Sequence, residues 1–120
     1  MGRIARRSLL LAGLTLGLGQ ACLSPTLPMP PPEEPQVTAG SDPDTVLLSG
    51  RIPYANSMVW AVNWSQADLD DPRAVGGDLS DDEGAYAFEL RGGQGDFCEI
   101  WYEHQGDKSQ IRQFEIPALP

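Results

Sequence analysis

Apolar and polar positions alternate along most of the chain from about residue 45 to its end. The alternation is clearest in three runs, MVWAVNW at 58–64, AYAFEL at 85–90 and FCEIWYEH at 97–104. A period of two is typical of a β-strand with one buried face. Shorter runs of the same kind, TVLLSG and QIRQFEIP, precede and follow these three. The pattern predicts an all-β domain of short strands.

Turn residues separate these runs. DDEG at 81–84, RGGQGD at 91–96 and HQGD at 104–107 each carry glycine next to acidic or amide residues, a composition that favours tight turns. The last two turns bracket one strand, so we expect a meander at the C-terminal end. No stretch combines helical spacing with caps. An antiparallel β-sandwich or barrel is therefore the expected architecture.

The alternation also groups the aromatic residues. Trp60 and Trp64 share a face with Met58 and Val62, which predicts that these tryptophans belong to the core. Trp101 stands between Glu99 and Glu103 on its own face. Trp101 is therefore the aromatic residue that we expect to be exposed and ligand-facing, for example as a platform on which a sugar could stack.

The first 21 residues have the features of a secretory signal peptide. Three arginines are followed by an apolar run at residues 9–18, which is too short to cross a bilayer that needs roughly 20 residues. Cys22 follows Gly19-Gln20-Ala21, which resembles a bacterial lipoprotein signal whose cysteine is lipidated. Cleavage by an ordinary signal peptidase, which would release a secreted or periplasmic protein, is the alternative.

Residues 22–44 are rich in proline, with seven of the 11 prolines of the chain. Such a composition favours extended polyproline II structure, and at about 3.1 Å per residue it would span roughly 60 Å. We therefore expect a disordered tether at 22–44 and a single domain at 45–120.

Charge restricts the partners. Of the eight basic residues, three lie in the signal peptide, which leaves five against 17 acidic residues and a net charge of −12. Such a surface repels phosphate backbones, which argues against nucleic-acid binding. Anionic head groups would repel it as well, so membrane attachment should be covalent.

Candidate chemistry is sparse. Asp78, Asp81, Asp82 and Glu83 are weak calcium candidates, because their spacing does not follow the D-x-[DN]-x-[DN]-G pattern and solvated loops explain them better. Cys98 is expected to be a buried thiol if Cys22 is lipidated, and a Cys22–Cys98 disulfide is open if it is not.

His104 is the only histidine of the chain, and no nucleophile or acid is nominated as its partner. Its place beside Gln105-Gly106-Asp107 predicts a solvent-facing turn. No serine lies in a G-x-S-x-G context. The sequence thus predicts neither catalysis nor a cofactor.

A family resemblance makes the fold prediction more specific. Gly50, Val59, Ala61 and the segment DDEGAYAF at 81–88 stand where carboxypeptidase regulatory-like or transthyretin-like modules have their G-x-V, V-x-A and D-x-x-G-x-Y-x-F motifs. The whole chain is similar to small lipoproteins of myxobacterial type, with their CLSPTLP start and PPP segment. The resemblance implies an immunoglobulin-like sandwich of about seven strands without catalytic residues.

These observations predict a lipid-anchored protein of the cell envelope, in the outer membrane, that presents a small β-sandwich for structural or binding purposes. Its expected partners are the membrane, through the lipid, and an envelope polysaccharide or protein. A carbohydrate- or calcium-binding surface module is the alternative function.

Overall fold

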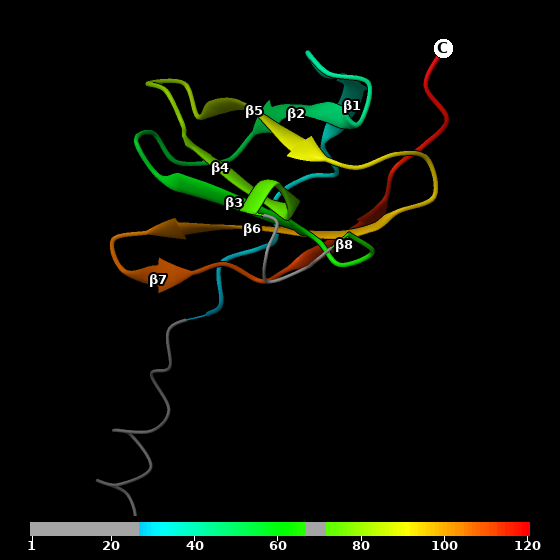
Figure 1. Ribbon diagram of the computed structural model, residues 1–120. Helices are drawn as coiled ribbons and strands as arrows, with labels where there is room; N and C mark the ends of the chain where they lie inside the picture. The colour runs from blue at the N-terminus through cyan, green and yellow to red at the C-terminus, as the bar shows by residue number, and fades with distance from the viewer. Residues whose placement is uncertain (1–26, 67–71) are drawn as a thin grey trace, which may run out of the picture.

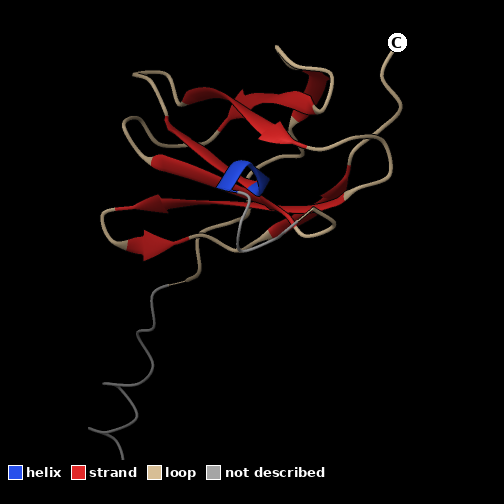
Figure 2. Cartoon of the chain, viewed as in Figure 1, coloured by secondary structure: helices blue, strands red, loops and turns tan. Residues whose placement is uncertain are grey.

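The computed structural model describes residues 27–66 and 72–120, which form a β-sandwich (Figure 1). Strands and loops make up nearly all of this region, with one short turn of 3₁₀-helix, η1 (Figure 2). The elements in chain order are β1 Gln36–Ala39, β2 Thr45–Arg51, β3 Met58–Asn63, η1 Pro72–Ala74, β4 Val75–Leu79, β5 Ala85–Arg91, β6 Phe97–His104, β7 Asp107–Lys108 and β8 Arg112–Glu115. The expected signal peptide and Cys22 lie outside the described residues.

The strands form two antiparallel sheets. One has three strands in the order β1-β2-β5, and the other has five, in which β4, β3 and β6 are neighbours and both β7 and β8 pair with β6. The expected all-β antiparallel sandwich is thus confirmed, with eight strands. Within the described ranges, no helix has the length and hydrophobicity that a membrane crossing requires.

The core lies between the two sheets and consists mainly of aliphatic, tyrosine and phenylalanine side chains. Its members are Val46, Leu48, Ile52, Val59, Ala61, Tyr86, Phe88, Leu90, Cys98, Ile100, Tyr102, Phe114 and Ile116. Alternate residues of each strand contribute, as expected for a sheet with one buried face. None of the three tryptophans belongs to this core.

The two ends of the sandwich are distinct. β6 ends in the turn to β7 beside the 52–57 and 80–84 turns, and we call this end the hairpin pole. β6 begins at the opposite end, where the 40–44 and 91–96 loops meet, and we call that end the loop pole. In Figure 1 the hairpin pole carries the orange β6–β7 turn.

The proline-rich segment differs from the expected tether. Residues 36–39, predicted to be disordered, form β1 and pair with β2. Before β1, the carbonyl oxygen of Met29 accepts a hydrogen bond from Gln110 N (3.0 Å), and that of Pro30 accepts one from the Tyr102 hydroxyl (2.9 Å). Residues 29–35, which we call the strap, therefore belong to the domain, and the domain boundary expected at residue 45 was placed too late.

Candidate functional site: the outward face of the five-stranded sheet

All three tryptophans of the protein lie on the outward face of the five-stranded sheet. Trp60 and Trp101 are directly opposite each other across β3 and β6, in register with inward-facing neighbours that are fully buried. Trp64 follows β3 on the same side, and its backbone N–H donates to Phe97 O (2.9 Å). We call this surface the tryptophan face; its members are Met58, Trp60, Val62, Trp64, Val75, Leu79, Phe97, Glu99, Trp101, Glu103, Lys108, Gln113 and Glu115.

This arrangement corrects the expected core. Trp60 and Trp64 do share a face with Met58 and Val62, but the face that packs against the other sheet carries Val59 and Ala61 instead, although Val62 is also buried. Trp64 is 53% exposed and Trp60 is half-buried. Both faces of β3 are apolar, so the alternation shows which residues lie together and not which side meets the other sheet.

The tryptophan face is unusually apolar for a surface. Six large hydrophobic residues are exposed in the described part of the chain, and four of them lie on this face: Trp64, Val75, Leu79 and Phe97. Contiguous apolar patches of this kind mark interaction sites in soluble domains. Exposure of single hydrophobic residues would carry no such meaning.

Two contacts hold the aromatic rings in place. Trp64 Nε1 donates to Glu99 Oε1 (2.9 Å), and Gln113 Nε2 donates to Glu99 Oε2 (3.2 Å). The Glu99 carboxylate on β6 thus links the residue that follows β3 to β8. The Trp60 ring lies next to Gly77 of β4. A Cβ at Gly77 would lie only 2.9 Å from Trp60 Cε3, so the glycine leaves room for the ring.

Trp101, the expected ligand-facing residue, is half-buried at the centre of this face. The ammonium of Lys108 lies 4.7 Å from its ring centroid, a cation–π contact. Its indole N–H is buried and has no acceptor among the described residues.

The calcium candidates are not brought together. Asp81 accepts from the backbone N–H groups of Glu83 (2.8 Å) and Ala85 (2.9 Å), and these bonds lower its pKa. Asp78 Oδ2 accepts a hydrogen bond from Ala87 N (3.3 Å), and Glu83 forms an ion pair with Arg51 (3.4 Å). Among residues 27–66 and 72–120, no three metal-binding side chains form a cluster. The acidic turn shapes the backbone, as Gly84 at φ +83° also does.

His104 is not in the solvent-facing position that its sequence context predicts. Its ring is half-buried, stacks on Tyr54 with centroids 3.9 Å apart, and its Nδ1 lies 2.7 Å from Ser57 Oγ. Ser57 is 3% exposed and its hydroxyl also lies 3.0 Å from Ala55 O. A substrate could not reach this buried hydroxyl, and the pair joins the 52–57 turn to β6. No sequence motif announces it, since the two residues are 47 apart.

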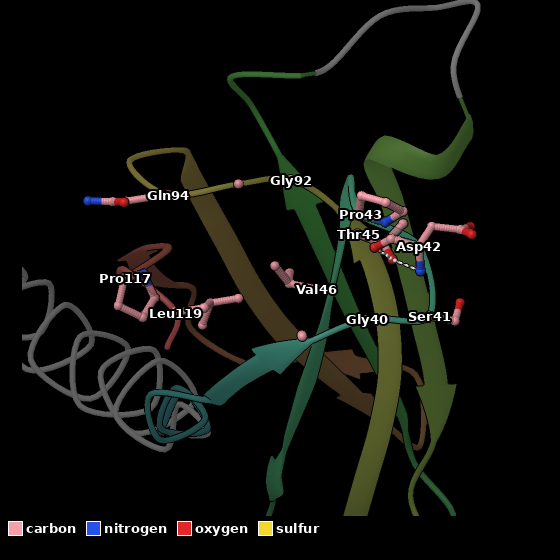
Figure 3. A pocket seen from close by; sticks show the side chains of 12 residues that line it. Gly40, Ser41, Asp42, Pro43, Thr45, Val46, Gly92, Gln94, Pro117 and Leu119 are labelled. Carbon is pink, nitrogen blue, oxygen red and sulfur yellow. Dashed lines mark hydrogen bonds between the residues drawn. The ribbon is translucent and has the colours of Figure 1, made fainter.

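A depression of about 380 Å³ lies at the loop pole (Figure 3). Val46 and Leu119 provide its apolar side, and the Asp42 side chain points away from them. Hydrogen bonds between Asp42 and Thr45 hold its rim. It offers shape without a charged or hydrogen-bonding group directed inward, so the tryptophan face is the stronger candidate.

Comparison with protein-family models, curated proteins and solved structures returned no match. The resemblance to carboxypeptidase regulatory-like and transthyretin-like modules therefore stays a prediction from the sequence.

Proposed function

We propose that this protein is a lipid-anchored cell-envelope protein whose β-sandwich binds polysaccharide through the tryptophan face, without catalysis. The observation that carries the proposal is that all three tryptophans lie on one outward sheet face. Indole rings combine a broad apolar surface with a polar edge, which suits the apolar face of a sugar ring.

The polar groups of the face favour a neutral polyhydroxyl ligand. Glu99, Glu103 and Gln113 alternate with the aromatic residues, so acceptors for hydroxyl groups lie beside each ring. The same carboxylates and the net charge of the chain would repel a phosphate-rich or otherwise anionic ligand. A neutral glycan has both the apolar faces and the hydroxyl donors that this surface matches.

The fate of Cys22 is supported indirectly. Cys98 is fully buried in the core near the loop pole, and burial raises the pKa of its thiol to about 12. A disulfide requires the two Cα atoms to come within about 7 Å, which a segment arriving at the opposite pole does not favour. This supports lipidation of Cys22, and Cys22→Ser should move the protein from the detergent phase to the aqueous phase.

Retention on immobilised polysaccharides tests the binding function. The wild-type protein and Trp64→Ala are compared on peptidoglycan, β-1,4-glucan, chitin and mannan, with Leu27→Ala, another exposed apolar residue, as the matched control. Trp64→Ala should weaken binding at least about tenfold, equivalent to ~1.4 kcal/mol, and Leu27→Ala should not. Equal binding by both variants would refute the tryptophan face as the site.

A further inference from the structure

The strap fixes where the lipid-bearing end of the chain meets the domain. The backbone N–H of Gln110 donates to Met29 O. Residues 27–29 lie beside Asp107 and Lys108 of β7. Because β7 directly follows the β6–β7 turn, the chain joins the sandwich on the side of the hairpin pole. In Figure 1 the blue segment passes next to β7.

The length between Cys22 and this attachment is short. Five residue steps separate Cys22 from Leu27, and at 3.3–3.6 Å each they span at most about 18 Å. The eight residues of β6 extend about 26 Å from the hairpin pole to the loop pole. The connection is shorter than the distance between the two poles. With Cys22 anchored in the membrane, the loop pole therefore could not contact the membrane while the hairpin pole points away from it.

We propose that the hairpin pole is the membrane-facing surface of the domain and that the loop pole points away from the bilayer. The inference rests on the proposed lipidation of Cys22. Its partner is the lipid head-group layer, approached through the covalent anchor and not through charge, since the domain is acidic. The loop-pole depression then lies on the side of the domain away from the membrane.

Energy transfer to a labelled bilayer tests the orientation. The lipidated protein is reconstituted into phosphatidylcholine vesicles with a rhodamine head-group acceptor, and a donor is attached at Asp107→Cys or at Gln94→Cys. Both positions are exposed and lie at opposite poles, whereas Cys98 is buried and its raised pKa keeps it unreactive. Transfer from residue 107 should exceed that from residue 94 at least about twofold, given a separation of about 26 Å.

Two further arms separate the possible failures. Flotation with the vesicles, compared with Cys22→Ser, reports anchorage alone: if the wild-type protein does not float, the proposed anchor fails and the orientation with it. If the protein floats and both positions transfer equally, or residue 94 transfers more, only the orientation is overturned.

A 20-residue Gly-Ser insertion between Ser24 and Pro25 adds about 25 Å of average reach and should remove most of the difference in energy transfer between residues 107 and 94. An undiminished difference in that variant would show that something other than the short connection orients the domain.

Discussion

Two carboxylates near the loop pole have lowered pKa values because of hydrogen bonds that only the folded chain provides. Glu89 accepts from the backbone N–H of Ser41 (2.9 Å), the Ser41 hydroxyl (2.8 Å) and the Thr45 hydroxyl (3.0 Å). Burial works to raise the pKa of Asp96, but bonds from the side chains of Asn63 and Gln66 and from Gly93 N outweigh it. These bonds tie the 40–44 and 91–96 loops to the sheets.

The sign of the effect follows from linkage. Because the folded pKa values lie below the unfolded ones, the stabilisation is complete above the unfolded values near 4 and is lost as the pH falls through the folded values. Urea denaturation from neutral pH to about pH 2.5 should show decreasing stability in this window. Glu89→Gln should make the decrease shallower. A free energy of unfolding that stays constant or rises on acidification would contradict the assigned bonds.

For single residues, the sequence predicts which side chains share a face of a sheet better than it predicts which face is buried. The alternation correctly groups Trp60, Trp64 and Met58, and it separates Trp101 from the core residues of β6. It does not tell which group faces inward when Val59 and Ala61 are equally apolar. Aliphatic, tyrosine and phenylalanine side chains fill the space between the sheets, and the indoles are left outside.

At the scale of elements, the strap is the feature that composition could not predict. Polyproline II has fixed φ angles and free carbonyl oxygens whether it extends into solvent or packs on a sheet. The decision depends on distant partners: Tyr102 and Arg112 donate to the carbonyls of Pro30 and Pro32. These donors come 72 and 80 residues later in the chain. The positions of β2, β3, β5, β6 and β8, in contrast, depend on local alternation and turn chemistry and agree with the expectation. The expected C-terminal meander does not form, because β5 pairs with β2 in the other sheet.

Tyr102→Phe tests the strap. The variant keeps the fully buried ring and removes only the bond to Pro30 O, so the free energy of unfolding should fall by about 0.5–1.5 kcal/mol. Limited proteolysis should also cut residues 23–31 faster than in the wild-type protein. Tyr54→Phe, which keeps the ring stacked on His104, serves as the control. Unchanged stability and unchanged cleavage for Tyr102→Phe would mean that the strap does not hold the domain.

At the scale of the whole molecule, the two sheets have different outward faces. The three-stranded sheet and the strap carry no tryptophan, whereas the five-stranded sheet gathers all three on one side. Intrinsic tryptophan fluorescence therefore reports on the tryptophan face alone, with no signal from the core. This distribution separates the residues that stabilise the fold from those assigned to binding.

Acrylamide quenching of that fluorescence, with and without a saturating polysaccharide, tests the claim most directly. The free protein should be readily quenched, since Trp64 is 53% exposed and Trp60 and Trp101 are half-buried. Bound polysaccharide should shift the emission to shorter wavelength and lower the quenching constant, because the glycan covers the rings. Unchanged emission and quenching with polysaccharide demonstrably bound, or no binding to any polysaccharide tested, would contradict the assignment of the tryptophan face as a glycan-binding surface.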